Sequence, residues 1–158
     1  MRWDVVVCVG VSCLALQLAL TSLFKCVGGF WSREPSFLAH QVIAFPLMVF
    51  LAVVGGTAWF ESISGASTLD DRVHGPNAAG EMIGSFLLGM MIFWDIPCSL
   101  LVTSLKSHIV LAHHIVVALG GFFVTYTPYV LYYVTFYGGL TELSSEHSNC
   151  ARSTSGSD

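Results

Sequence analysis

The sequence predicts an all-α protein, a polytopic bundle of about five transmembrane helices that occupies residues 1–143. Two features of its composition support this fold class. Hydrophobic residues make up 54% of the 158 residues and charged residues only 10%, and the mean hydropathy is +0.73. A soluble domain carries about a quarter charged residues. A third observation is that the apolar residues gather in runs of about 20, the length that crosses a bilayer core.

Charge and cysteine content exclude several other classes of protein. The net charge of −4 is small and no basic run is present, so nucleic acid is not an expected partner. The five cysteines form no CxxC pair and no His/Cys ligand spacing, which argues against a disulfide framework and against a zinc site. We expect neither a bound metal nor a cofactor.

The first two apolar runs each predict a membrane helix. Residues 5–24, "VVVCVGVSCLALQLALTSLF", reach across the hydrocarbon core at 1.5 Å per residue. A signal peptide is less favoured, because only Arg2 marks a basic start and "FKCVGGF" is a poor cleavage site. The second run, residues 37–60, ends in an aromatic pair typical of the head-group region, and Pro46 should kink it. Residues 61–81 predict the longest hydrophilic loop, since turn-forming residues are frequent there.

The second half of the chain predicts three more spans. A third run covers residues 82–102, and apolar character resumes after "TSLKSH" and continues to residue 143. This last stretch is too long for one span, and Pro128 disfavours helix in the residue before it. We therefore expect a fourth helix at 109–125 and a fifth at 128–143. The Ser-rich tail, residues 144–158, is expected to be disordered.

The distribution of Lys and Arg favours a cytoplasmic C-terminus. With five spans, one side of the membrane carries four basic residues and the other side two. The four are Lys25, Arg33, Lys106 and Arg152, and the two are Arg2 and Arg72.

Four ionisable residues lie within the last three predicted spans: Asp95, His113, His114 and Glu142. A charged side chain at membrane depth costs roughly 2.5–3.5 kcal/mol, so such residues face a partner or a wet cavity. Helix rise places Asp95 roughly 12 Å, and the histidines roughly 7–9 Å, from the side of the "TSLKSH" loop. Glu142 returns toward that side near the end of the fifth helix. The spacing predicts a carboxylate–imidazole cluster in one leaflet.

Such a cluster suits general base catalysis, because imidazole accepts a proton near neutral pH and a carboxylate orients it. A structural role in helix packing is the alternative. A metal site formed by Asp95, one histidine and Glu142 is less favoured, since no local ligand motif accompanies them. Adjacent helical residues diverge by about 100°, so one histidine should face a cavity while the other contacts a neighbouring helix. The aromatic run "TYTPYVLYYVTFY" fits either an acyl-chain groove or an interfacial belt.

Three segments, "FWDIPCSLL", "LKSHIVLAHHIVV" and "TFYGGLTELSS", resemble the core of the TLC domain over residues 82–146. In ceramide synthases, which belong to that family, the His pair and acidic residues on the following helix are implicated in acyl transfer. An acyl-CoA thioester there gives its acyl group to the amine of a sphingoid base. The resemblance assigns these roles to His113, His114 and Glu142. Synthases carry two aspartates, whereas this sequence has one Glu142 and places Ser145 at the second position.

"TELS" is closer to the TLC-domain-containing proteins that are linked to membrane phospholipid composition. The resemblance therefore implies a multi-pass protein of the endoplasmic reticulum or another endomembrane, acting in lipid homeostasis, handling or sensing, with membrane lipids as partners. One alternative is a ceramide synthase, with acyl-CoA as co-substrate and a sphingoid base as acceptor. Another is a non-catalytic scaffold or trafficking partner. TLC domains continue with further helices, so the resemblance also implies a C-terminally truncated member.

Overall fold

The computed structural model describes residues 1–65, 68–127 and 131–138, except for the side chains of residues 62–65. Every regular element within these residues is a helix, which confirms the predicted all-α class. In chain order the elements are α1 (Trp3–Val27), the 3-10 turn η1 (Gly29–Ser32), α2 (Pro35–Gly65), α3 (Leu69–His74), α4 (Ala78–Met90), the π-helix η2 (Met91–Asp95), α5 (Ile96–Leu101), the 3-10 turn η3 (Thr103–Leu105), α6 (His108–Tyr126) and α7 (Leu131–Tyr137).

Four segments of the described chain are long and apolar enough to cross a membrane. They are Trp3–Val27, Pro35–Glu61, Leu69–Leu101 and His108–Tyr126, and they contain most of the first four predicted spans. The protein is therefore an integral, multi-pass membrane protein. The fifth predicted span, 128–143, coincides with α7 only in part, because residues 128–130 and 139–143 lie outside the described residues, as does the tail.

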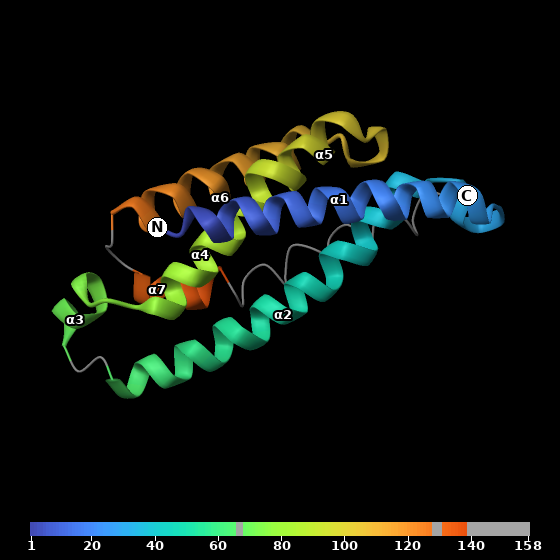
Figure 1. The fold of residues 1–158 in the computed structure, drawn as a ribbon. Coiled ribbons are helices and arrows are strands. Elements are labelled where there is room, and N and C mark those ends of the chain that lie inside the picture. Colours follow the sequence, from blue (N-terminus) through green and yellow to red (C-terminus); the bar gives the residue numbers. More distant parts are fainter. Residues whose placement is uncertain (66–67, 128–130, 139–158) are drawn as a thin grey trace, which may run out of the picture.

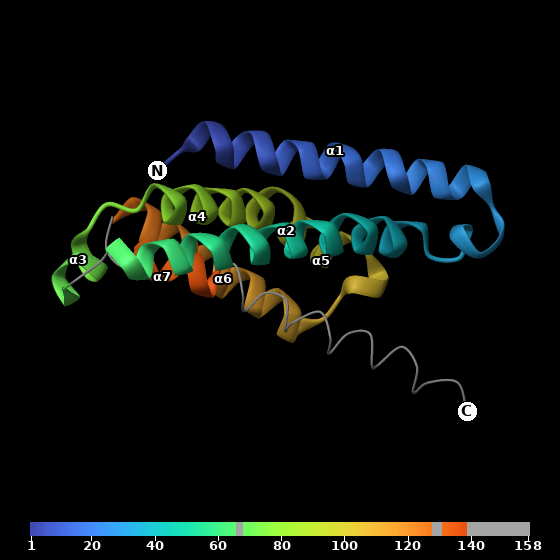
Figure 2. The ribbon, with the colours of Figure 1, turned by 90° about the horizontal axis from the view of Figure 1, so that it is seen from below.

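The central element of the bundle is the continuous run of α4, η2 and α5. Helix α4 contacts α1, α2, α6 and α7, and the long helices lie side by side with similar axes (Figures 1 and 2). In the membrane-spanning segment that contains α4, 67% of the 18-residue apolar stretch is buried inside the protein. In α6 the corresponding share is 11%. The core accordingly gathers around the central run. Its largest fully buried side chains are Trp94, Leu51, Leu88, Met90 and Met91.

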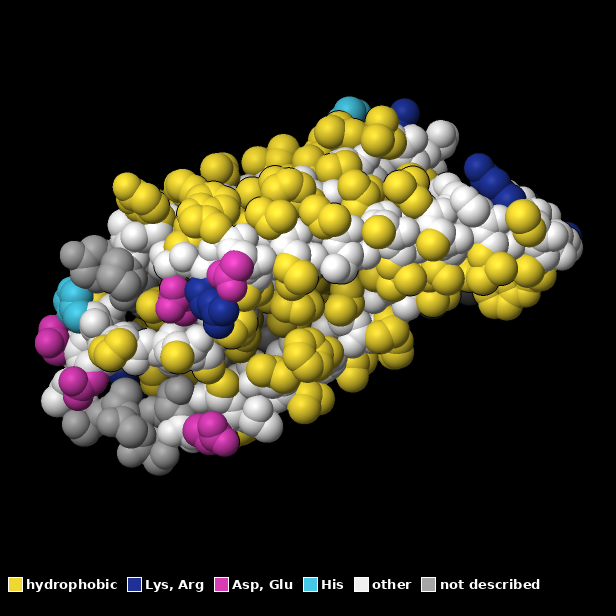
Figure 3. Space-filling model, in the orientation of Figure 1, with side chains coloured by type: hydrophobic (Ala, Val, Ile, Leu, Met, Phe, Trp, Pro, Cys, Tyr) yellow, Lys and Arg dark blue, Asp and Glu magenta, His cyan; other side chains and the backbone are white. Residues whose placement is uncertain are grey.

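The outer faces of the long helices are apolar, as expected of surfaces in contact with lipid. Leu18 of α1 is 62% exposed and Val116 of α6 is 67% exposed. Figure 3 shows hydrophobic side chains along the length of the visible face, while most of its charged side chains lie toward its two ends. This distribution is the reverse of what a soluble bundle shows.

Two glycines of the "GSFLLGMM" stretch allow close approach of neighbouring helices. A Cβ atom at Gly84 would lie 2.7 Å from Cγ2 of Thr125 on α6. A Cβ atom at Gly89 would overlap the carbonyl oxygen of Val6 on α1. Small residues permit such backbone contacts between membrane helices.

The region predicted as a loop, 61–81, is partly helical. Helix α2 continues to Gly65 with Pro46 inside it, and α3 occupies Leu69–His74. Thr68 and Asp71 form a capping box at the start of α3, in which each side chain binds the backbone of the other. The prediction of a hydrophilic loop over the whole of this region was wrong, because it counted turn-forming residues and overlooked this capping pattern.

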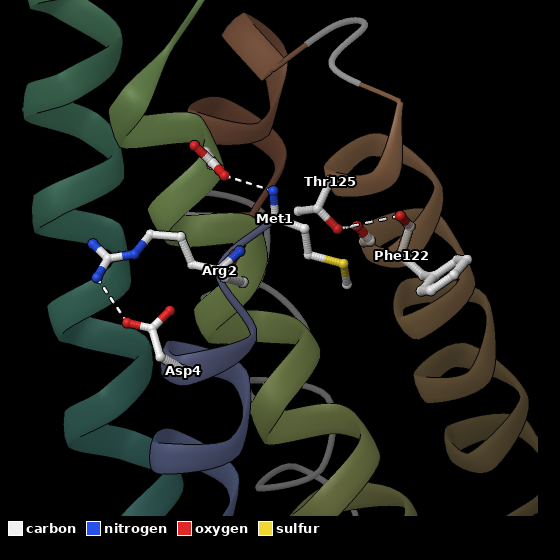
Figure 4. A network of polar contacts seen from close by, with 8 residues as sticks. Met1, Arg2, Asp4, Phe122 and Thr125 are labelled. Carbon is white, nitrogen blue, oxygen red and sulfur yellow. Dashed lines mark hydrogen bonds and ion pairs between the residues drawn. The ribbon is translucent and has the colours of Figure 1, made fainter.

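Polar contacts close the bundle at the end where α1 begins (Figure 4). The amino group of Met1 lies 2.7 Å from Oε1 of Glu81, and the guanidinium of Arg2 lies 2.8 Å from Oδ2 of Asp4. The hydrogen bond that Arg2 donates to Asp4 raises the pKa of the Arg2 guanidinium. The hydroxyl of Thr125 donates to backbone carbonyls of its own helix, one of them that of Phe122.

Candidate functional site

A buried contact between a histidine and an aspartate joins the second span to the third. Nε2 of His40 on α2 lies 3.0 Å from Oδ1 of Asp95, the last residue of η2. The two side chains are only 11% and 4% exposed. An acidic side chain at this depth requires a polar partner within the protein. The partner of Asp95 is therefore an imidazole from a span that the sequence prediction had not included in the cluster.

A chain of aromatic and amide contacts continues from this pair. The ring of His40 stacks on Trp94, with 4.5 Å between the ring centroids. The indole N–H of Trp94 donates to Oε1 of Gln17 on α1 at 3.3 Å, and Nε2 of Gln17 donates to the carbonyl oxygen of Ser36 at 2.8 Å. Polar side chains from the first three spans thus contact one another in the apolar interior, where most buried polar groups are paired. Nδ1 of His40 is the exception in this network, because it is buried and has no hydrogen-bond partner within the described residues.

Local chain chemistry explains the position of Trp94 and Asp95. Both belong to the π-helix η2, which comes immediately before "IPCSLL" and hence before Pro97. In a regular α-helix the proline ring would clash with the carbonyl of Phe93, and that carbonyl would lose its donor. The wider π-turn lies where this clash and this lost hydrogen bond would occur. Such π-turns are frequent at functional sites.

The two adjacent histidines of α6 point in different directions. Nδ1 of His114 lies 3.3 Å from the hydroxyl of Ser99 on α5, and its ring is within electrostatic range of Asp95 and His40. His113 is more exposed and lines a cavity. Their ring centroids are 5.8 Å apart. One histidine therefore contacts the polar cluster and the other faces the cavity, as the 100° step of an α-helix dictates.

The cavity has a volume of about 610 Å³ and lies between α4, α6 and α7. Along α6 its wall runs from His113 to Val124, roughly 16 Å at 1.5 Å per residue. Glycine and apolar residues predominate in the wall, and among the described residues that line it His113 is the one member of the His, Asp, Glu, Lys and Arg types. The lining residues are Gly84, Leu87, His113, Val117, Gly120, Gly121, Val124, Tyr133, Val134, Tyr137 and Gly138.

The structure brings together three of the four residues singled out in the sequence. His114 lies near Asp95, and His113 lies beside His114. Glu142 lies outside the described residues. The residue that sequence reasoning missed is His40. The rule that found the others, an ionisable residue inside an apolar run, applies equally to "FLAHQVIAF".

The described residues contain no group of three His, Cys, Asp or Glu side chains placed to hold a metal ion. The arrangement instead offers two functions that imidazole and carboxylate share, hydrogen bonding and proton exchange. Cys13, Cys98, Cys8 and Cys26 are free thiols, and Cys150 lies outside the described part of the chain.

Comparisons with protein-family models, with curated proteins and with solved structures found no match to this chain.

Proposed function

We propose that the protein binds the acyl chain of a membrane lipid in the cavity between α4, α6 and α7, and acts in lipid homeostasis, handling or sensing. The observation that carries this proposal is the cavity itself, about 610 Å³, apolar and flanked by a single imidazole. Its volume is in the usual range for small-molecule sites. The resemblance to the TLC domain is consistent with this role and favours the endoplasmic reticulum or another endomembrane.

An apolar cavity inside a membrane is expected to be filled by hydrocarbon. A void forfeits dispersion contacts on its walls, and lipid tails are as apolar as the leucine and valine side chains around them. The apolar walls alone discriminate little between lipids for the same reason. Selectivity is therefore assigned to His113, which offers a hydrogen bond to the polar end of the bound chain.

A large side chain placed on the wall of the cavity is expected to fill it. A Cβ atom at Gly120 meets no atom within 4 Å, so a large side chain is accepted there. Gly120→Trp should weaken saturable binding of a spin-labelled fatty acyl lipid to the purified protein by at least about tenfold, or 1.4 kcal/mol. The control is Leu119→Trp, at a residue that is 64% exposed and is not part of the wall. Equal binding by both variants would show that the lipid does not occupy this cavity.

The same preparation tests the alternative of acyl transfer, in which one histidine of α6 is the base or the nucleophile. Given acyl-CoA and sphinganine, the protein should yield little ceramide by mass spectrometry. Asp95 is held by His40 on another helix, which leaves it less available to orient His113 or His114. Robust ceramide formation that disappears in His113→Ala would reverse this preference and make the protein a synthase.

A further inference from the structure

A second hollow, of about 480 Å³, lies at the end of the bundle where α2 begins and α5 ends. Its wall includes Pro35 and Leu101, which are the terminal residues of two membrane-spanning segments. The ends of spans lie at the boundary between hydrocarbon and head groups. The hollow is therefore at the depth of lipid head groups, unlike the cavity beside α6.

The residues around this hollow have a consistent chemistry. Glu34 is the one charged residue among them, and three hydroxyl residues, Ser36, Thr103 and Ser104, line the same hollow. Phe37 and Leu101 add apolar surface. Glu34 takes part in none of the ion pairs formed within the described chain. Its carboxylate is thus available to accept from an ammonium group, while hydroxyls can donate to phosphate oxygens.

The walls of the hollow are held by specific hydrogen bonds. The carbonyl oxygen of Ser36 accepts from the side chain of Gln17, which is 4% exposed and is itself held by Trp94. The backbone N–H of Leu38 donates to the backbone carbonyl oxygen of Glu34 at 3.0 Å, which fixes the Glu34 backbone at the start of α2. On the opposite wall, the backbone N–H of Lys106 donates to the backbone carbonyl oxygen of Thr103 at 3.3 Å. The buried polar network described above therefore also fixes the geometry of this surface.

We infer that the hollow binds the head group of a lipid that carries a primary ammonium next to a phosphate, the phosphoethanolamine class. The ammonium donates to the carboxylate of Glu34, and the phosphate oxygens accept from the hydroxyls of Ser36, Thr103 and Ser104. A charge-assisted N–H···O bond is about twice as strong as a neutral one. The trimethylammonium group of choline has no N–H to donate, so the site discriminates between the two common zwitterionic head groups.

The test compares spin-labelled phosphatidylethanolamine with phosphatidylcholine of the same chains, bound to the full chain in detergent micelles. The ethanolamine lipid should bind at least tenfold more tightly, and Glu34→Gln should remove that preference. Glu61→Gln, at the opposite exposed end of the same membrane-spanning segment, is the matched control and should retain the preference. Gly120→Trp should also retain it, because that variant blocks only the cavity beside α6.

Three results would overturn the inference. The first is equal affinity of the wild-type protein for the two lipids. The second is a preference for ethanolamine that survives in Glu34→Gln, which would place the discriminating group elsewhere. The third is displacement of the lipid by an equal concentration of soluble glycerophosphoethanolamine, which would make the ligand a water-soluble phosphoamine.

Discussion

Asp95→Ala is expected to lower the free energy of unfolding by about 3 kcal/mol, the upper end of the usual cost of leaving a buried polar group without its partner. The carboxylate contacts His40 at 3.0 Å and is 4% exposed, so water cannot replace it. The substitution leaves the imidazole of His40 facing apolar neighbours without its hydrogen-bond partner. Unfolding in mixed detergent micelles, followed by tryptophan fluorescence, measures the loss, because Trp94 stacks on the same imidazole.

The chain provides a matched control in the pair formed by His74 and Asp70. These residues are the same types at nearly the same distance, 2.9 Å, but their side chains are 53% and 85% exposed. An exposed pair contributes between about 0.2 and 1 kcal/mol. Asp70→Ala should therefore cost at most about 1 kcal/mol. A loss in Asp95→Ala no larger than in Asp70→Ala would mean that the buried pair does not stabilise the bundle.

A double replacement separates the pair's charge from its volume. His40→Phe combined with Asp95→Leu removes both polar groups and retains an aromatic ring against Trp94. Buried ion pairs replaced by apolar groups of similar volume often leave stability unchanged or raise it. The double variant should therefore be more stable than Asp95→Ala. If it binds acyl lipid as wild type does, the pair serves the architecture; if binding falls, it positions the histidines of α6.

Much of the fold follows from elementary features of the sequence. The apolar runs locate three of the four long spans to within a few residues, because membrane thickness dictates their length. The third span ends where predicted but begins at Leu69, well before the predicted start at residue 82. The end of α6 at Tyr126 agrees with the helix-breaking effect of Pro128 on the residue before it. These predictions are local, since each depends on one segment and on the bilayer.

The pairing of Asp95 was beyond this kind of reasoning. Depth along each helix placed Asp95 near His114 in one leaflet, but depth says nothing about which neighbouring helix faces the carboxylate. His40 lies only five residues into α2, in the same leaflet, and helix packing determines that it is the hydrogen-bond partner of Asp95. The π-turn before Pro97 also departs from the 3.6-residue period of an α-helix, which a periodic pattern does not anticipate. The pairing of Asp95 therefore depends on long-range helix packing, which the sequence pattern does not predict.

Gly89→Ala is expected to destabilise the protein by about 1–3 kcal/mol, the usual cost of overpacking a well-packed core. A Cβ atom there would overlap the carbonyl oxygen of Val6, and backbone cannot rotate away as a side chain can. On the facing helix, a Cβ atom at Gly10 would lie 2.6 Å from the carbonyl oxygen of Gly89, so α1 and α4 cross with their backbones nearly in contact. The added methyl group must push α1 outward.

Gly120→Ala is the matched control, because the same chemical change is expected to have the opposite effect on stability there. Alanine favours a helix over glycine by up to about 1 kcal/mol, and a Cβ atom at Gly120 meets nothing within 4 Å. That variant should unfold at the same denaturant concentration as wild type or a higher one, whereas Gly89→Ala should unfold at a lower one. The same chemical change then has opposite consequences on two helices. A Gly89→Ala protein as stable as Gly120→Ala would show that α1 does not pack against α4 this closely in solution.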